Sequence, residues 1–289
     1  MRPEASSGMS IQIRLMDADD IPDGMRLKEF AGWNQTPADW ERFLLACPLG
    51  CFVAEWDRQV VGSVTTIVYE EKFAWIGMVL VDPAYRGRGI GTQLLGKAIE
   101  YLDSIGVPTV KLDATPQGRP IYEKLGFVPE YDIERWTLHR EPGSLASLPP
   151  ATLPDFDKIL EMDREVFGAD RSELLRSIHL DAPDFTLAVK LHGELAGYAL
   201  GRGGTRADHL GPWVAWDEPT AWELLDEFLR RSVRETIIVD VLKNNPVAVR
   251  LLESRQFKLS RPFTRMVRGP NAHPGNPELV CAILGPEFG

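Results

Sequence analysis

A glycine-rich segment between an apolar strand and an amphipathic helix sets the strongest limit on the fold of this chain. The segment reads Arg86-Gly87-Arg88-Gly89-Ile90-Gly91 and follows the apolar run Met78 to Val81. Glycine lets the backbone turn without a Cβ in the way, and the amides that open the next helix then point together at a bound anion. The two arginines can add charge-assisted hydrogen bonds. The segment therefore predicts a strand, a phosphate-binding turn and a helix, in that order.

The spacing of the glycines separates three kinds of phosphate loop. A P-loop closes with Gly-Lys-Ser/Thr, whereas Gly91 is followed by Thr92-Gln93, which excludes that loop. A dinucleotide fingerprint begins close to the strand end and reads G-x-G-x-x-G. Here five residues separate Val81 from Gly87, and position 92 is threonine. Asp113, about twenty residues further on, is the one feature that favours a dinucleotide.

The pattern that fits is R-x-x-G-x-G, with Arg86, Gly89 and Gly91 at the required positions. It resembles the pyrophosphate loop of the GNAT superfamily of N-acetyltransferases, which use acetyl-CoA. The later segment Tyr122-Glu123-Lys124-Leu125-Gly126-Phe127 resembles the helix with which that family continues. One departure is Thr115, since many members carry asparagine there.

The resemblance implies a mixed α/β fold, in which helices flank a mixed, mostly antiparallel, twisted sheet. A splayed pair of parallel strands holds acetyl-CoA, and the strand over residues 109–112 is one of the pair. The resemblance also implies the residues that contact acetyl-CoA: Met78, Val79, Leu80, Val81, Arg86, Gly87, Arg88, Gly89, Ile90, Gly91, Thr92, Thr115 and Tyr122.

Acyl transfer to an amine needs a neutral nitrogen and a proton for the departing thiolate. The resemblance implies that Tyr122 is the general acid, and a tyrosine pKa near 10 is close enough to a thiol pKa near 8.5 for this transfer. The family often places a glutamate on the strand before the loop, but residues 73–78 contain no carboxylate. Asp113, Glu70 and Glu71 are the remaining candidates for the base.

The loop between the first two predicted helices, 17–30 and 37–46, is expected to line the acceptor pocket. Thr36 and Asp39 form a helix-capping pair in this loop. Trp33, Asn34 and Gln35 are not part of this cap and are expected to contact the acceptor. An apolar wall with neighbouring amides suits a small polar molecule.

The two halves of the sequence show the same order of predicted elements, which indicates one fold repeated in tandem. Two predicted helices, 153–167 and 171–180, begin the second half, and two, 17–30 and 37–46, begin the first. The segment Arg255-Gln256-Phe257 corresponds in position to Leu125-Gly126-Phe127. We predict an acetyl-CoA-binding domain over 9–140, a linker over 141–149 and a degenerate domain over 150–289. Residues 214–222 stand in place of the glycine loop, contain two carboxylates and have no glycine, so the second domain is expected to cover the acceptor site. Residues 201–206 are expected to form a hairpin.

Composition limits the partners. A net charge of −10 argues against nucleic acid, whose binding rests on clustered lysine and arginine. No apolar run is long enough to span a bilayer, and residues 1–8 lack the apolar core of a secretory signal, so Met9 is a candidate start. The three cysteines show no metal-ligand spacing. These features favour a cytoplasmic monomer or homodimer with reduced thiols and no metal.

We therefore predict an N-acetyltransferase that acts on the amine of a small molecule. No cysteine is placed to form a covalent intermediate, which favours direct attack in a ternary complex. The alternative is a non-catalytic acyl-CoA sensor, because the strand glutamate is missing and one domain is degenerate.

Overall fold

The computed structural model describes residues 11–141 and 155–289. The chain divides into two compact units. Unit 1 comprises residues 11–67 and 76–106; unit 2 comprises 68–75, 107–141 and 155–289. The candidate start at Met9 lies outside the described residues, as does the predicted linker apart from Glu141.

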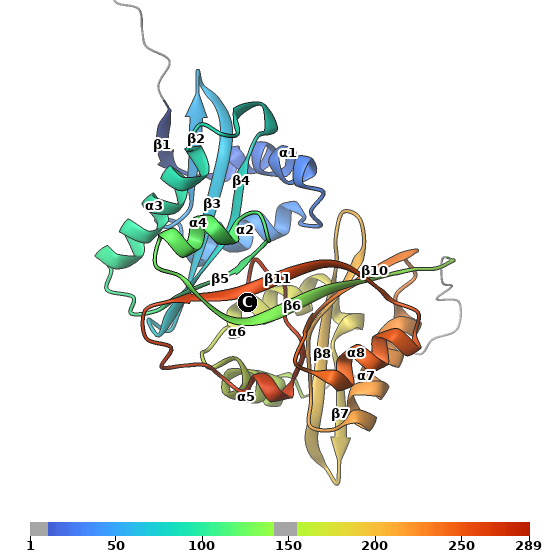
Figure 1. The fold of residues 1–289 in the computed structure, drawn as a ribbon. Helices are drawn as coiled ribbons and strands as arrows, with labels where there is room; N and C mark the ends of the chain where they lie inside the picture. The colour runs from blue at the N-terminus through green and yellow to red at the C-terminus, as the bar shows by residue number, and fades with distance from the viewer. Residues whose placement is uncertain (1–10, 142–154) are drawn as a thin grey trace, which may run out of the picture. The chain divides into compact units, whose positions relative to one another are not determined.

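Unit 1 is a small sheet with helices, coloured in the blue and teal part of Figure 1. β1 pairs antiparallel with β2, and β2 pairs antiparallel with β3; β4 is the next neighbour of β3. Its elements are β1 (Gln12–Leu15), a 3-10 turn (Ala18–Asp20), α1 (Ile21–Ala31), α2 (Pro37–Ala46), β2 (Phe52–Trp56), β3 (Gln59–Tyr69), β4 (Phe73–Val81), a 3-10 turn (Pro83–Tyr85) and α3 (Ile90–Ser104). The last residues of β3 and the first of β4 belong to unit 2.

Local sequence explains where the helices of unit 1 begin. Thr36 and Asp39 form the predicted capping box at the start of α2, and Pro37 occupies the first turn, where its missing N–H costs nothing. The predicted helix over 17–30 is wrong in its first turn: Asp17 caps a 3-10 turn, and α1 begins only at Ile21. The Asp17 carboxylate accepts from Asp19 N, which favours a tight turn over a regular helix start.

Unit 2 holds the rest of the fold. Its elements, besides the hairpin of β3 with β4, are β5 (Val110–Ala114), α4 (Arg119–Lys124), β6 (Val128–His139), α5 (Phe156–Phe167), α6 (Ser172–Asp181), a 3-10 turn (Pro183–Phe185), β7 (Leu187–Leu191), β8 (Glu194–Gly203), β9 (Asp208–Ala215), α7 (Glu218–Arg231), β10 (Thr236–Leu242), α8 (Pro246–Ser254), β11 (Lys258–Arg268), a 3-10 turn (Pro277–Leu279) and β12 (Val280–Ala282).

The strands of unit 2 interleave the two halves of the sequence. β4 and β5 pair in parallel through Ala74 with Val110 and Trp75 with Lys111. β11 then pairs antiparallel with both β5 and β6. Residues 133–139 of β6 pair antiparallel with β10. The order is therefore β5-β11-β6-β10, and Figure 1 shows the orange β11 beside the green β6. A strand from each half is embedded between strands of the other half.

The packing of β6 follows from this exchange. Trp136 and Leu138, on β6, are buried in the same apolar cluster as Trp213 and Phe228, which come from the second half of the chain. Alternate residues of a strand face the same side of the sheet, so the pair presents one apolar face to this cluster. The core of the second half is thus completed by a strand of the first.

The fold class expected from the sequence is confirmed: the sheet is mixed and mostly antiparallel, with the parallel pair β4–β5 and flanking helices. The hairpin near 201–206 is also confirmed, because Gly203 of β8 pairs with Asp208 of β9. The helix expected over 153–167 is α5, from Phe156, and residues 153–154 lie outside the described part. The domain boundaries at 140 and 150 stay a prediction.

Three further properties concern the described residues. All three cysteines are free and buried. Within residues 11–141 and 155–289, no cluster of three or more His, Cys, Asp or Glu side chains is arranged to hold a metal ion. In the same ranges, no helix combines the length and the apolar character that a membrane crossing requires.

Candidate functional site

The glycine loop lies in unit 1 and opens α3. Gly87 and Gly89 both have φ of 77°, the left-handed region that glycine adopts without penalty, and Gly89 is the N-cap of α3. The Arg86 guanidinium donates from Nε to Val81 O at 3.0 Å. Arg88 stacks over Trp56, with its guanidinium carbon 5.1 Å from the ring centroid. Both arginines therefore hold defined positions beside an exposed turn.

This loop has room for an anion. A Cβ built on Gly87 meets nothing within 4 Å, and one built on Gly89 meets only the flexible end of Gln93 at 3.9 Å. The first amides of a helix have no partner inside the helix, so Ile90, Gly91 and Thr92 are positioned to donate to an anion. The local geometry fits the phosphate-binding turn that the sequence predicts.

The strand before the loop carries a backbone irregularity. Met78 has φ of 49°, which is rare for a side chain of its size, and its carbonyl accepts a hydrogen bond from Ser63 Oγ at 2.9 Å. Met78 and Leu80 are buried, whereas Val79 and Val81 are half-buried. The backbone thus departs from the extended form where the sequence predicts contacts to acetyl-CoA.

The predicted acceptor residues lie between α1 and α2. Asn34 and Gln35 are buried, and Trp33 is half-buried. Gln35 Oε1 accepts no hydrogen bond from the residues that the structure describes. A buried carbonyl oxygen without a donor is costly, so this atom is suited to a ligand that brings an N–H or O–H.

Unit 2 holds the predicted general acid. Tyr122, on α4, is half-buried, and its ring packs edge-on against Phe127 with 6.1 Å between the centroids. Burial raises the pKa of Tyr122 to about 12. The backbone of Gly118 passes so close to the ring that an added Cβ would lie 2.9 Å from Tyr122 Cε2. Thr115 Oγ1 accepts from Gly118 N at 3.2 Å, so this side chain closes the turn before α4.

Two of the three predicted base candidates are held by cations. Asp113, on β5, is buried and forms a bidentate ion pair with Arg265 on β11, with both N–O distances 2.9 Å. Burial raises the pKa of the Asp113 carboxyl, and the Arg265 guanidinium opposes that shift. Breaking such a buried pair costs about 3–5 kcal/mol, so Asp113 is committed to Arg265.

Glu70 and Glu71 form the turn between β3 and β4, and both have positive φ. Glu70 receives hydrogen bonds from Lys72 Nζ and Asp170 N, each at 2.8 Å, and from Arg164. The hydrogen bond from Lys72 is the largest cause that lowers the pKa of Glu70 to about 2. Glu71 is exposed. Glu70 is therefore ionised and occupied at neutral pH.

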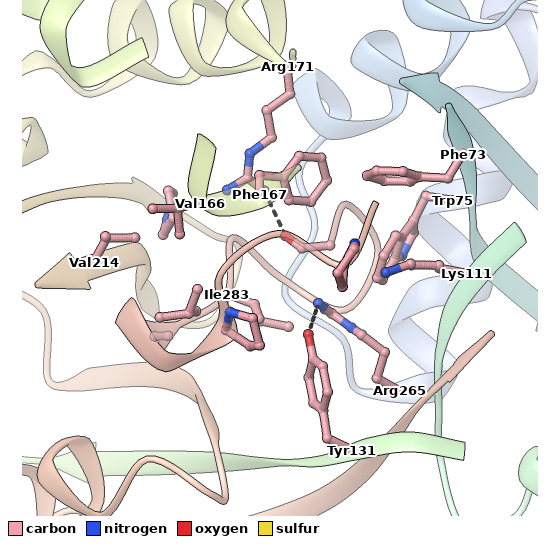
Figure 2. Close-up of a pocket in the computed structure, with 16 residues that line it drawn as sticks. Phe73, Trp75, Lys111, Tyr131, Val166, Phe167, Arg171, Val214, Arg265 and Ile283 are labelled. Carbon is pink, nitrogen blue, oxygen red and sulfur yellow. Dashed lines mark hydrogen bonds between the residues drawn. The ribbon is translucent and has the colours of Figure 1, made fainter. Parts of the chain in front are cut away.

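A cavity in unit 2 brings together residues that the sequence analysis missed. Figure 2 shows Phe73, Trp75 and Lys111 on one side, Val166, Val214 and Ile283 on the other, and Tyr131 below them. Arg265 donates from Nη1 to Tyr131 Oη at 2.7 Å, and its guanidinium lies 4.5 Å from the Trp75 ring centroid. One signal was available in the sequence: Lys111 is a charged residue flanked by the apolar residues Val110 and Leu112 in a predicted strand.

The segment from Leu284 to Gly289 was also missed. Its carbonyl groups accept hydrogen bonds from Tyr69 Oη, at Phe288, and from Trp75 Nε1, at Pro286. Arg171 Nη1 donates to Gly289 O at 2.9 Å while the same guanidinium holds Asp163. These donors lie far away in the sequence, so no local pattern reveals the contacts.

Comparisons with known proteins point to one family. The family model described as "Acetyltransferase (GNAT) family" matches residues 22–127, and "Acetyltransferase (GNAT) domain" matches residues 159–280. The chain is 28% identical over 149 residues to holothin acyltransferase from Pseudoalteromonas sp. (strain SANK 73390), covering 50% of this chain and 49% of that protein. It is 29% identical over 154 residues to an uncharacterized N-acetyltransferase from Bacillus subtilis (strain 168), covering 52% and 54%.

A crystal structure from Pyrococcus horikoshii is similar over 100% of this chain and 99% of its own, with a TM-score of 0.81 and 24% identity. That likeness concerns the fold. The segments matched to the two curated relatives span about half of the length of each.

Proposed function

Because this chain belongs to the GNAT superfamily of acetyltransferases and carries two such domains in tandem, we propose that it transfers an acetyl group from acetyl-CoA to the amine of a small molecule. The amine attacks the thioester directly in a ternary complex. The observation that carries this proposal is the exposed glycine turn from Arg86 to Gly91 at the start of α3, whose open space and amides suit a pyrophosphate.

In this proposal each predicted residue has a role. The amides that open α3 and the two arginines of the loop hold the pyrophosphate, and backbone groups from Met78 to Val81 pair with the pantetheine arm. Tyr122 donates a proton to the departing thiolate, and its raised pKa keeps the phenol protonated at neutral pH. Thr115 lies beside the pantetheine.

One coenzyme binds per chain in this proposal. α7 stands in the second half where α3 stands in the first, and the carboxylate of its N-cap Asp217 accepts from Thr220 N at 2.8 Å. That carboxylate occupies the amide site that an anion needs, and Glu218 adds a second negative charge. The domain over 150–289 then helps to enclose the acceptor beside the domain over 9–140.

The acceptor contacts Trp33, Asn34 and Gln35 in this proposal. The unpartnered Gln35 Oε1 supports it, because an acceptor amine supplies the missing donor. Asp113, Glu70 and Glu71 stay proposals for the base, and the ion pairs of the first two weigh against that role. The proposal includes a cytoplasmic monomer or homodimer.

The test is to incubate the purified chain with acetyl-CoA and a panel of small amines and to follow free thiol. Amine-dependent thiol release with a matching mass gain of one acetyl group on the amine supports the proposal. Tight acetyl-CoA binding without thiol release for any amine contradicts it and favours the alternative, a non-catalytic acyl-CoA sensor.

A further inference from the structure

Lys111 is a buried amine at the edge of the cavity in Figure 2. It lies on β5, opposite Trp75 in the last parallel pair that the structure shows between β4 and β5. Its side chain is 5% exposed. Burying an ammonium group is costly unless partners compensate for the lost water, so the contacts of Lys111 decide its protonation.

Those contacts only partly compensate. Glu130 Oε2, on β6, lies 3.5 Å from Lys111 Nζ, which is longer than a good charge-assisted hydrogen bond. The other Glu130 oxygen accepts from Asn271 Nδ2 at 2.7 Å. The Phe73 ring centroid is 5.3 Å from Nζ, a distance at which the ring face weakly favours a cation.

The remaining charged groups around Lys111 balance one another. On its own strand, Asp113 is neutralised by Arg265 of β11, which also binds Tyr131 Oη of β6. Arg171, across the cavity, is neutralised by Asp163. Burial lowers the pKa of Lys111, Arg265 acts in the same direction, and Glu130 and Asp113 oppose the shift.

The proposed reaction still lacks a base. The segment 73–78 contains no carboxylate, Asp113 and Glu70 are held in ion pairs, and Glu71 is exposed in a turn. Lys111, by contrast, lines the cavity, and the Glu130 carboxylate is 3.5 Å from its Nζ. The cavity holds about 30 Å³, which is room for about one or two waters or for an amino group.

We propose that Lys111 is the general base of the acetyl transfer: its neutral amine accepts a proton, directly or through one water, from the ammonium group of the acceptor at the cavity beside β5. This inference rests on the proposed function, because it assigns the missing base of that reaction. Its geometry is a buried lysine with a long ion pair to Glu130, lining a cavity with room for an amino group.

The step balances. An N–H bond of the acceptor ammonium breaks, its electron pair stays on the acceptor nitrogen, and a new N–H bond forms on Lys111 Nζ, which becomes an ammonium. The neutral acceptor nitrogen then bonds to the acetyl carbon, and the carbon–sulfur bond breaks. Tyr122 protonates the thiolate and recovers a proton from the amide nitrogen, while Lys111 releases its proton to solvent.

The protonation of Lys111 can be measured without turnover. Lysine labelled with ¹³C at Cε is incorporated into the full chain, and its NMR signals are followed against pH; the Lys111 signal is the one that disappears in Lys111→Arg. We expect Lys111 to titrate below the ordinary lysine pKa of about 10.4, and lower still in Glu130→Gln. A Lys111 signal at or above the ordinary value overturns the inference, whatever the amine panel shows.

The kinetic test compares variants with one acceptor at each pH. Lys111→Arg keeps a cation of similar reach that cannot act as a base, and Lys111→Met keeps the apolar stem. We expect both to lose about 100-fold or more in kcat/KM and to lose the fall in rate on the acid side of the pH profile. In Glu130→Gln that acid limb moves to lower pH. Lys243→Met, at an exposed lysine elsewhere in unit 2, is the matched control with unchanged rate.

The outcomes separate this inference from the proposed function. Transfer by the wild-type chain with an unchanged acid limb in a folded Lys111→Arg variant overturns the inference and leaves the proposed function intact. Absence of transfer by the wild-type chain for every amine removes both. Thermal unfolding of each variant shows whether a lost rate reflects lost structure.

Discussion

At the residue scale, the ionisable side chains of unit 2 differ in whether a partner is available to each. Asp113 and Glu70 are both acids near the β4–β5 pair, yet one is buried against Arg265 and the other is held by Lys72 and Arg164. Tyr122 has an apolar neighbour, Phe127, and remains protonated. The chemical role of a titratable group therefore depends on its contacts more than on its residue type.

The Tyr122 hydroxyl is expected to matter for turnover and not for binding. Tyr122→Phe removes the proton donor and keeps the ring, so we expect kcat to fall by about 10²- to 10⁴-fold while the Kd for acetyl-CoA stays unchanged. Steady-state kinetics measures kcat, and calorimetry measures the Kd for acetyl-CoA. An unchanged kcat at every pH would show that Tyr122 does not act as the acid.

A second variant tests the position of that hydroxyl. Gly118→Ala puts a methyl group 2.9 Å from Tyr122 Cε2, so the ring has to move. We expect a lower kcat although the hydroxyl is still present, and no further loss when Gly118→Ala is added to Tyr122→Phe.

At the element scale, the loop before α3 combines exposure with two left-handed glycines. Its geometry is local: the strand, the turn and the helix are consecutive in sequence, and backbone groups supply most of what the site needs. This is why the order of strand, turn and helix could be predicted from the sequence, while contact with a coenzyme stays a prediction.

Gly89→Val is expected to abolish coenzyme binding. A left-handed backbone costs a side-chain-bearing residue about 1–2 kcal/mol, and the branched side chain fills the space in front of the amides of α3. Gly106→Val is the matched control, because Gly106 has φ of 76° with nothing within 4 Å and lies at the other end of α3. Calorimetry with acetyl-CoA distinguishes them: normal affinity in Gly89→Val, or equal losses in both variants, would contradict the assignment of the site.

At the scale of the whole molecule, the two halves of the sequence share strands. β6 from the first half lies between β11 and β10 of the second, and β11 lies between β5 and β6 of the first. Trp136 of β6 is 7% exposed within the apolar cluster of the second half. Each half leaves unpaired strand edges and an open core without the other.

The exchange predicts that neither half folds alone. We expect residues 1–149 and residues 150–289, expressed separately, to be insoluble or to lack cooperative unfolding, because exposed strand edges and apolar faces favour aggregation. Coexpressed, the two pieces are expected to form a soluble heterodimer with a single unfolding transition. Circular dichroism and gel filtration check this. Independent folding of either piece would mean that the exchanged strands are dispensable.

The features that could be predicted from the sequence are mainly those that short-range patterns encode. The helix cap at Thr36 and the turn from Arg86 to Gly91 each depend on residues a few positions apart, and the repeat follows from comparing the two halves of the sequence. The contacts inside unit 2 could not be predicted in this way. They include the ion pair of Asp113 with Arg265 and the pairing of β6 with β10 of the second half.

The sequence by itself thus determined the turn and the helix that follows it, because hydrogen bonds between neighbours in the chain enforce them, and its motifs indicated the class of fold through a family resemblance. Only the tertiary structure decided which carboxylates are occupied, that Lys111 faces a cavity, and that the halves exchange strands. Those features depend on contacts between residues on different elements, such as Asp113 with Arg265, and the desolvation that lowers the pKa of Lys111 exists only once the chain has closed around it.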